Sequence, residues 1–159
     1  MITQQQLVEV FDYHEGILYW KTNRGNRIKA GDAAGCLHHS GYVQIRIDRK
    51  SYLAHRLIFL WHYGYLPPYI DHIDRNRSNN RIENLREATK QQNQGNRVAN
   101  KNNTTSLKGV YLIERSGKWG ARIGMNGSCK KLGTFTNKED AYLAYCNAAK
   151  EKFGVYACL

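Results

Sequence analysis

Long apolar runs, paired cysteines and an excess of acidic charge are all missing from this sequence of 159 residues. The longest uninterrupted apolar run is Leu57 to Trp61, far short of the roughly 20 residues that span a bilayer. The start, Met1 to Leu7, is too polar for a signal peptide, so we expect a soluble, cytoplasmic protein with no membrane partner. The four cysteines form no CxxC pair, which excludes a zinc ribbon or a dense disulfide framework and indicates free thiols.

Basic residues exceed acidic residues in every part of the chain. The 24 Lys and Arg against 13 Asp and Glu leave a net charge of +11. The net charge is +2 in residues 1–52, +4 in 53–105 and +5 in 106–159, so no segment is an isolated basic tail. The 42% apolar and 11% aromatic content exclude a wholly disordered chain. Cations carried on folded modules suit polyphosphates, so the composition favours a nucleic-acid partner over a merely soluble basic protein.

The first part of the chain predicts an antiparallel meander followed by one helix. Glycines and turn residues separate short apolar pieces that are typical of strands. These pieces are residues 17–20, 33–36, 42–47 and 52–53. In the third piece Val43, Ile45 and Ile47 alternate with polar residues, which predicts one buried face. Apolar residues at helical spacing predict a short, mostly buried helix over 54–63, ended by Gly64.

Two polar stretches follow that helix. Residues 71–84 are too rich in Asn, Arg and Asp for a core, so they predict a functional loop. A brief strand at 85–88 and a short polar helix that begins at Thr89 come next. Residues 98–105 are rich in Asn and have no hydrophobic periodicity, which predicts a linker.

Beyond the linker the sequence predicts a small three-stranded sheet packed on one helix. The strand-like pieces are residues 108–114, 118–126 and 130–136, with Asn126-Gly127 as a hairpin turn. The helix begins after Thr136 or Asn137 and ends at Gly154. One face of the middle strand carries Trp119, Ala121, Ile123 and Met125. The opposite face has little bulk and one long cation, Arg122.

Three motifs with chemical character lie between residues 71 and 93. Asn84, followed by Leu85, lies twelve positions after His72 of the Asp71-His72 pair, and Asn93 lies nine positions after Asn84. This set resembles the HNH nuclease family, and in particular the phage-type HNH homing endonucleases, over most of residues 40–97. The resemblance implies a ββα-metal fold and hydrolysis of phosphodiester bonds in double-stranded DNA. It also implies a bacterial cell that is infected by a phage or carries one.

The resemblance assigns roles to four residues, and general chemistry explains their types. His72 becomes the base, since imidazole titrates near neutrality. Asp71 and Asn93 become hard oxygen ligands of one Mg²⁺ or Mn²⁺ ion, with the scissile phosphate and waters completing the shell, and they suit zinc poorly. Asn84 becomes the residue whose hydrogen bonds present His72 correctly. Many HNH enzymes end the motif with His, so Asn93 implies weaker metal binding, and no small-molecule cofactor is expected.

Other polar residues in this region have plainer interpretations. We expect His55 and His62 to be packing or supporting residues and not ligands. Turn formation explains Asn76, Asn79 and Asn80, while phosphate contacts stay open for Arg75, Arg77 and Arg81. Because neighbours in a regular strand point to opposite faces, Asp71 and His72 must lie where a strand breaks into a loop.

The C-terminal segment carries a second set of motifs. The matching pieces are Lys108–Tyr111, Gly117–Trp119, Ala121–Ile123, Leu132–Phe135 and Ala141–Gly154. They resemble the plant apetala-two or ethylene-response-factor DNA-binding domain, which implies that the sheet reads the major groove. The contact residues so implied are Lys108, Tyr111, Lys118, Arg122 and Lys131. Arg122 best suits a base edge, because a guanidinium matches the two acceptors of guanine.

The sequence therefore predicts an α+β protein with a catalytic and a targeting module. Residues 1–97 form the HNH module, with its motif in 69–97, and residues 98–105 link it to the apetala-two-like module at 106–159. The predicted function is a metal-dependent endonuclease that acts on double-stranded DNA as a monomer. The alternative is a catalytically inactive, sequence-specific DNA-binding regulator, against which the intact motif argues. An RNA-binding module is disfavoured because no aromatic-lined platform motif for single strands is present.

Overall fold

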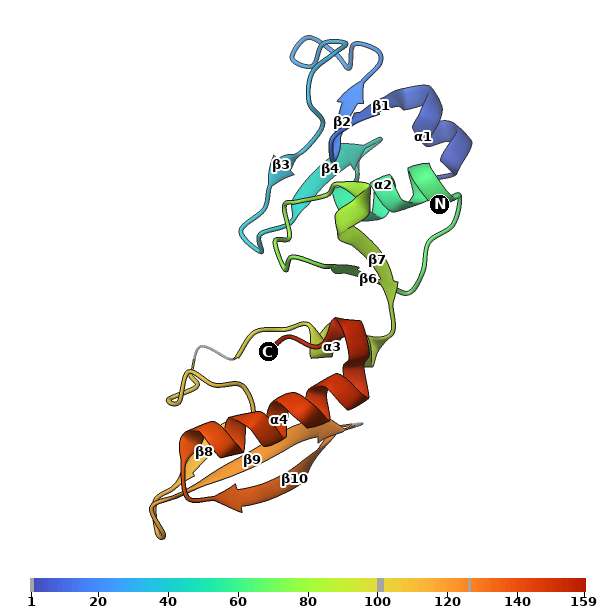
Figure 1. The fold of residues 1–159 in the computed structure, drawn as a ribbon. Coiled ribbons are helices and arrows are strands. Elements are labelled where there is room, and N and C mark those ends of the chain that lie inside the picture. The colour runs from blue at the N-terminus through green and yellow to red at the C-terminus, as the bar shows by residue number, and fades with distance from the viewer. Residues whose placement is uncertain (1, 100–101, 126) are drawn as a thin grey trace. The chain divides into compact units, whose positions relative to one another are not determined.

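Helices and short antiparallel sheets alternate along the described residues, 2–99, 102–125 and 127–159, of this computed structural model (Figure 1). This mixture confirms the α+β class. The chain divides into two units, Met1–Thr89 and Lys90–Leu159, so the division falls inside the 1–97 module expected from sequence. The first unit has a net charge of +3 and the second, with twelve basic and four acidic residues, has +8.

In the described part of the chain no helix has the length and apolar character needed to cross a membrane.

The first unit begins with helix α1 (Gln4–Val10) and strand β1 (Phe11–His14), for which no element was predicted, and with strand β2 (Ile17–Trp20), which confirms the strand predicted at 17–20. Helix α1 has a capping box, in which Thr3 and Gln6 satisfy each other's backbone N–H groups. Strands β1 and β2 form an antiparallel hairpin.

The predicted helix is present, and the last three of the four predicted strands form one antiparallel sheet, whereas the strand at 17–20 pairs with β1 instead. Strands β3 (Cys36–Leu37), β4 (Val43–Ile47) and β5 (Lys50–Leu53) form an antiparallel sheet in that order. The strand predicted at 33–36 is shorter than expected and begins at Cys36, with Ala33 making an isolated bridge to β2. Helix α2 (Ala54–Tyr63) ends at Gly64, whose φ of 77° and N–H bond to the Leu60 carbonyl stop the helix.

One apolar core joins the elements of the first unit. Its fully buried large side chains come from α1, β1, β2, β4 and α2, namely Leu7, Phe11, Leu18, Ile45, Leu57 and Ile58. Each such burial contributes roughly 1.5–3 kcal/mol to the free energy of unfolding. The hairpin of β6 (Tyr69–His72) and β7 (Leu85–Ala88) joins this core through Ile70 and Leu85, so β6 is anchored beside α2. A short 3-10 helix, η1 (Ile82–Asn84), precedes β7.

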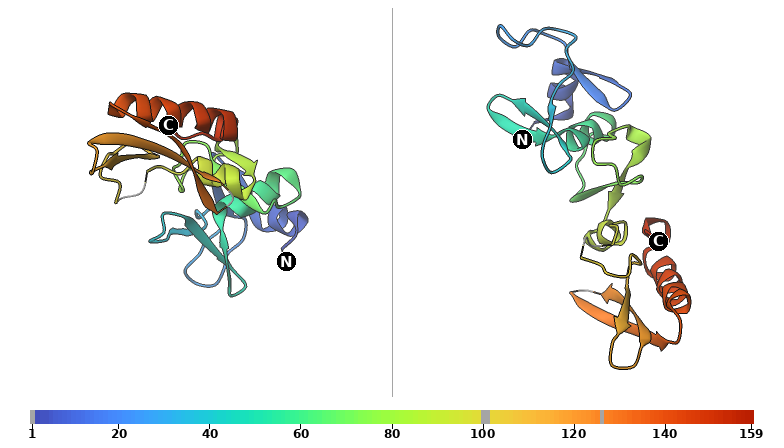
Figure 2. Two further views of the ribbon diagram at one scale, coloured as in Figure 1. Left: turned by 90° about the horizontal axis from the view of Figure 1, so that it is seen from below. Right: turned by 90° about the vertical axis from the view of Figure 1, so that its left-hand side faces the viewer.

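The second unit is a three-stranded sheet with α4 along one face, as Figures 1 and 2 show. It contains α3 (Lys90–Gly95), β8 (Val110–Ile113), β9 (Lys118–Met125), β10 (Ser128–Phe135), α4 (Lys138–Phe153) and η2 (Gly154–Tyr156). The strand order is β10-β9-β8, all antiparallel. The Asn137 side chain accepts from the Asp140 N–H at 2.8 Å and caps α4, as predicted. Residue 126 of the predicted hairpin turn lies outside the described residues.

Small residues set the spacing between α4 and the sheet. Ala121 on β9 and Ala141 and Ala149 on α4 are completely buried, so the helix lies close to the middle strand. Gly109 has a φ of +78°, and a Cβ built on it would lie 2.2 Å from the Tyr145 ring. The chain entering β8 therefore passes too close to α4 for any side chain at this position.

The segment predicted to be a linker is tied into the second unit at its C-terminal end, where Asn103 Nδ2 donates to the Leu107 carbonyl at 2.7 Å and Thr105 Oγ1 to the Val110 carbonyl at 3.0 Å. Asn103 Oδ1 accepts from the backbone N–H and the hydroxyl of Thr105, which is buried. Lys108 Nζ donates to the carbonyls of Gly95, at 2.6 Å, and Arg97. Residues 100 and 101 of this segment lie outside the described residues. Hydrogen bonds thus hold the C-terminal end of the segment, and Lys108 joins the residues on either side of it.

The close approach at Gly109 predicts a specific loss of stability. Gly109→Ala should lower the free energy of unfolding of the second unit by roughly 2–5 kcal/mol, because left-handed backbone strain adds to overpacking against Tyr145. Gly117→Ala is the matched control, since its φ of +65° is also left-handed but nothing lies within 4 Å of its Cβ. It should cost only about 1–2 kcal/mol. Urea unfolding, monitored by hydrogen exchange of the amides in β8–β10, measures the free energy of unfolding of both variants. Equal losses of stability in Gly109→Ala and Gly117→Ala would contradict the close packing at Gly109.

Candidate active site

The predicted catalytic pair lies at the end of a buried strand. Asp71 and His72 are the last two residues of β6, with only 4% and 5% of their surfaces exposed. His72 pairs across the hairpin with Leu85 of the core, and Asp71 pairs with Arg86. The strand gives way directly to a polar loop, whose first residue, Ile73, donates its N–H to the Asn84 carbonyl at 2.9 Å. Both side chains are therefore positioned by regular structure at the point where the loop begins.

A buried hydrogen bond determines the orientation and protonation of His72. Its Nε2 lies 3.1 Å from Oδ1 of Asn80, a residue that is only 3% exposed. An amide oxygen accepts hydrogen bonds, so Nε2 carries the proton and Nδ1 keeps its lone pair. Burial lowers the pKa of His72 below its ordinary value of 6.5, against the opposing effect of the Asn80 hydrogen bond. His72 is thus a neutral imidazole at neutral pH, which is the form that a general base requires.

Two aromatic rings support His72 from the first unit. The His55 ring, on α2, meets the His72 ring edge-on with 5.0 Å between centroids. Tyr42 lies 5.2 Å from His55 and 6.0 Å from His72. Burial, followed by the charges of His72 and Arg56, lowers the pKa of His55 to about 3. His55 is therefore an uncharged packing partner of His72.

Asn84 closes the loop that follows His72. Its Nδ2 donates to Asp74 Oδ1 at 2.9 Å and to the Asn79 carbonyl at 2.7 Å, while its Oδ1 accepts from the Asp74 N–H at 3.0 Å. Burial works to raise the pKa of Asp74, but hydrogen bonds from Asn79, Asn76 and Asn84 outweigh it and lower the pKa. This geometry fits the orienting role expected for Asn84, and it adds Asp74 as the acceptor at the centre of the loop.

Asp71 forms a buried ion pair with the residue opposite it on β7. Arg86 Nε and Nη2 both approach Asp71 Oδ2 at 2.8 Å. The Asp71 side chain is 5% exposed and the Arg86 side chain 17%, so solvent screens this ion pair little. Both guanidinium nitrogens converge on one carboxylate oxygen. Arg86 is therefore a neighbour of the expected metal ligand that the sequence analysis did not single out.

The expected metal ligands belong to different units. Asp71 is in the first unit, whereas Asn93 lies on α3 in the second. Within the described residues no group of three or more His, Cys, Asp or Glu side chains could hold a metal ion. A carboxylate and an amide oxygen fit a hard cation such as Mg²⁺ that takes its other ligands from water and phosphate. The metal site stays a prediction.

Two of the three loop arginines are anchored within the first unit. Arg77 Nη1 donates to the Ser40 carbonyl at 2.9 Å, and its guanidinium lies 5.0 Å from the centroid of the Tyr42 ring. Arg81 pairs with Glu15, in the turn between β1 and β2, at 2.9 Å. These exposed contacts tie the loop to neighbouring turns, so phosphate contacts by the two arginines stay open.

The second unit gathers four of the five predicted DNA contacts on one face. Alternation along β9 puts Lys118 and Arg122 on the face opposite α4, and Lys131 is the cross-strand partner of Arg122. The Arg122 guanidinium lies 5.1 Å from the centroid of the Tyr111 ring, which itself lies across Gly120. We call this set, Tyr111, Lys118, Arg122 and Lys131, the open face. Lys108, the fifth, instead donates to the two backbone carbonyls of the 95–97 segment.

Comparisons with known proteins agree with the class that these features define. Residues 52–95, which contain α2, the β6–β7 hairpin and α3, match the family model described as HNH endonuclease. A protein of Acanthamoeba polyphaga mimivirus named as an uncharacterized HNH endonuclease is 36% identical over 124 residues. That match covers 76% of this chain and 63% of the viral protein, so the chain spans less than two thirds of its relative. No solved structure matches. These findings support an HNH nuclease, while the apetala-two resemblance stays a prediction.

The low pKa of His55 predicts acid sensitivity of the first unit. With a pKa of about 3 folded and about 6.5 unfolded, His55 takes up its proton first in the unfolded chain. Its contribution to stability is therefore complete above pH 6.5 and falls as the pH drops toward 3. Between about pH 7 and 5 the loss should be about 2 kcal/mol.

Urea unfolding at several pH values measures this loss. His55→Phe should flatten the pH dependence by that amount, whereas His14→Phe, at an exposed position of β1, should leave it unchanged. Equal pH dependence in the wild type and His55→Phe would contradict the burial of an uncharged His55.

Proposed function

We propose that this protein is a divalent-metal-dependent HNH endonuclease that hydrolyses phosphodiester bonds of double-stranded DNA. The observation that carries the proposal is the buried, neutral His72, oriented by Asn80 at the end of β6. The match of residues 52–95 to the HNH endonuclease family model supports it. Its setting, from the resemblance to phage-type enzymes, is the cytoplasm of a bacterial cell that is infected by a phage or carries one.

In the proposed mechanism His72 acts through its unprotonated Nδ1. A water molecule that attacks the phosphorus must lose a proton, and a neutral imidazole held in one orientation accepts it. The proton on Nε2 stays in the hydrogen bond with Asn80, whose amide oxygen also stabilises the imidazolium that forms. Asn84 keeps the loop after His72 closed, so the base does not drift from its position.

Asp71 and Asn93 are the proposed holders of one Mg²⁺ or Mn²⁺ ion, and they keep this role from the sequence resemblance. When bound, the ion would neutralise charge that develops on the phosphate and the leaving oxygen. The chain's own contribution is a pair of hard oxygen ligands. Arg86 fixes the orientation of the Asp71 carboxylate through Oδ2.

The second unit is the proposed targeting module, with the open face in the major groove. Its net charge of +8 supplies the attraction to phosphates. Arg122 stands on this face between Gly120, which the Tyr111 ring covers, and Gly124, over which nothing lies within 4 Å of a built Cβ, and its guanidinium suits guanine. Lys118 and Lys131 suit the flanking phosphates.

The alternative function, a catalytically inactive DNA-binding regulator, is favoured by one observation. The ion pair with Arg86 gives Asp71 a structural role that needs no metal. Plasmid cleavage in Mg²⁺, Mn²⁺, Zn²⁺ and excess chelator separates the two functions. The nuclease proposal expects cleavage with Mg²⁺ or Mn²⁺, little with Zn²⁺, and none with chelator. Duplex binding without cleavage under every condition would favour the regulator, and cleavage in chelator would remove the metal from the mechanism.

Substitution of the base and of its hydrogen-bond partner should reduce turnover to different extents. His72→Ala should lower the cleavage rate by about 10²- to 10⁴-fold, the usual contribution of a general base. Asn80→Ala should lower it by a smaller factor, roughly tenfold, because the base remains but its orientation is lost. The affinity for duplex DNA should stay unchanged in both variants, and a filter-binding assay measures this affinity. Full activity of His72→Ala would exclude the histidine as the base.

Two substitutions on the open face should have different signatures in DNA binding. Arg122→Ala should relax the preference at particular base pairs by roughly 1–3 kcal/mol. Lys131→Ala should weaken binding to all duplexes alike and reduce the slope of log affinity against log salt concentration by about one. Lys108→Ala is the control, because Lys108 is not part of the open face and donates to backbone carbonyls instead. This substitution should change neither the base preference nor the salt slope. A duplex panel at two salt concentrations measures all three, and an unchanged panel for Arg122→Ala would remove this residue from base recognition.

A further inference from the structure

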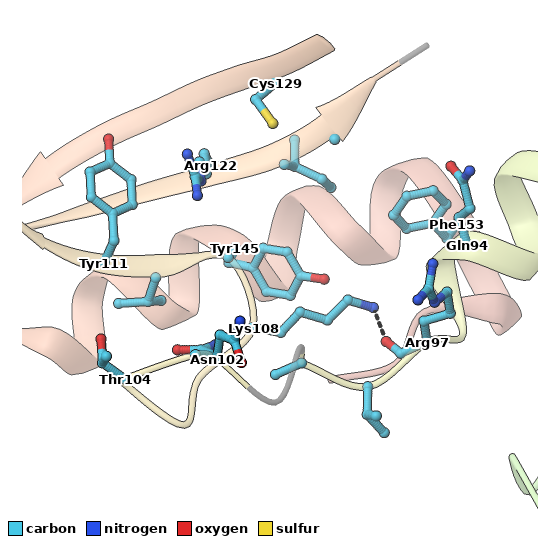
Figure 3. A pocket seen from close by; sticks show the side chains of 17 residues that line it. Gln94, Arg97, Asn102, Thr104, Lys108, Tyr111, Arg122, Cys129, Tyr145 and Phe153 are labelled. Carbon is cyan, nitrogen blue, oxygen red and sulfur yellow. Dashed lines mark hydrogen bonds between the residues drawn. The ribbon is translucent and has the colours of Figure 1, made fainter. Parts of the chain in front are cut away.

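The second unit contains a cavity of about 550 Å³ beside the open face (Figure 3). Figure 3 shows Tyr111, Arg122 and Cys129 on the strands at one side, with Lys108 and Asn102 at the other. All seventeen described residues that line it belong to the second unit. The cavity shares Tyr111 and Arg122 with the open face, but the rest of the proposed DNA-binding mechanism does not use it.

The charge of the lining selects an anion. Arg97, Lys108 and Arg122 are all part of it, and none of the seventeen described lining residues is acidic. The hydrogen bonds from Lys108 to two backbone carbonyls hold its ammonium in place without neutralising its charge. The guanidinium of Arg122 stacks over the Tyr111 ring and makes no hydrogen bond or ion pair with any described residue.

The volume of the cavity and its uncharged lining residues suit a ligand that is larger than a phosphate ion. Cavities of roughly 300–1,000 Å³ hold small organic ligands, whereas a phosphate ion alone would leave most of this space empty. Val98, Ile123 and Phe153 give the cavity apolar walls that suit the flat surface of a base. Gln94 and Asn102 add amide donors and acceptors, which match the hydrogen-bonding edge of a base. Cations, amides and apolar walls in one cavity are the combination that a nucleotide needs.

We infer that this cavity binds a single nucleotide, with the phosphate attracted by Arg97, Lys108 and Arg122 and the base against the apolar walls. The ligand chemistry has two sources, a free mononucleotide or one unpaired nucleotide of a DNA strand. The inference goes beyond the proposed function, since neither duplex cleavage nor the open face requires such a site.

Alkylation of Cys129 in the full-length protein tests this inference. Cys129 is exposed and lines the cavity, whereas Cys36 is exposed on β3 of the first unit and serves as an internal control. The four deoxynucleoside monophosphates are added singly, with inorganic phosphate and sodium chloride at matched ionic strength as comparisons. N-ethylmaleimide labelling of each cysteine is then followed by peptide mass spectrometry.

We expect at least one nucleotide to slow the labelling of Cys129 severalfold and to leave Cys36 unchanged, with inorganic phosphate less effective. Arg97→Gln, at an exposed position, should abolish the protection, and Arg97→Lys should restore part of it. Lys118→Gln removes a cation of the open face that does not line the cavity, so protection should persist. Absence of protection by every nucleotide, equal protection by salt, or equal loss in Lys118→Gln would each overturn the inference.

A second arm identifies the source of the nucleotide. Binding to a fully paired duplex is compared with binding to the same duplex carrying one unpaired nucleotide. A preference of fivefold or more for the unpaired nucleotide, lost in Arg97→Gln, assigns the cavity to DNA. Protection by a mononucleotide without this preference assigns it to the free ligand. Failure of duplex cleavage would overturn the proposed function but leave the mononucleotide result intact, so the two failures are distinguishable.

Discussion

The hydrogen bond between His72 and Asn80 is the interaction on which the candidate active site depends. A buried imidazole loses its contacts with water, and an unpaired N–H there costs about 1–3 kcal/mol. Asn80 satisfies that N–H and, because its oxygen only accepts, also selects the protonation state of the ring. The neutral ring in turn packs edge-on against His55, which is uncharged for the same reason of burial. Orientation, protonation and packing of His72 thus have one common cause.

The remaining contacts keep Asn80 where this hydrogen bond needs it. Asn84 clamps the loop from inside through Asp74 and Asn79, and Arg77 and Arg81 tie it to neighbouring turns from outside. A long polar loop would otherwise sample many conformations, with a backbone entropy of roughly 1–2 kcal/mol per residue. The first unit therefore supplies a rigid site with little net charge. The second unit carries most of the positive charge and a cationic face, which suits the targeting role proposed for it.

Local patterns in the sequence were enough to predict most of the fold. Alternation in β4, the apolar stripe and Gly64 of α2, and the cap at Asn137 are set by neighbouring residues, and the structure contains all three. Helix α1 could not be predicted in this way, because only Leu7 of it is buried and it has almost no apolar stripe. The sequence predicts only a turn at Asn80, because a buried hydrogen bond to a residue eight positions away leaves no local signal. The hydrogen bonds of Lys108 to backbone carbonyls and the ion pair of Arg86 with Asp71 leave no local signal for the same reason.

The protonation of His72 tests this account most directly, since it depends on the Asn80 contact and not on the substrate or metal. Long-range proton–nitrogen NMR of the full chain at about pH 7 reports which ring nitrogen carries hydrogen, and the His72→Gln spectrum assigns the signal. We predict a neutral ring with the proton on Nε2 and an unprotonated Nδ1, and a shift toward mixed tautomers in Asn80→Ala. A doubly protonated ring, or a neutral ring with its proton on Nδ1, would contradict the assignment of His72 as an oriented base.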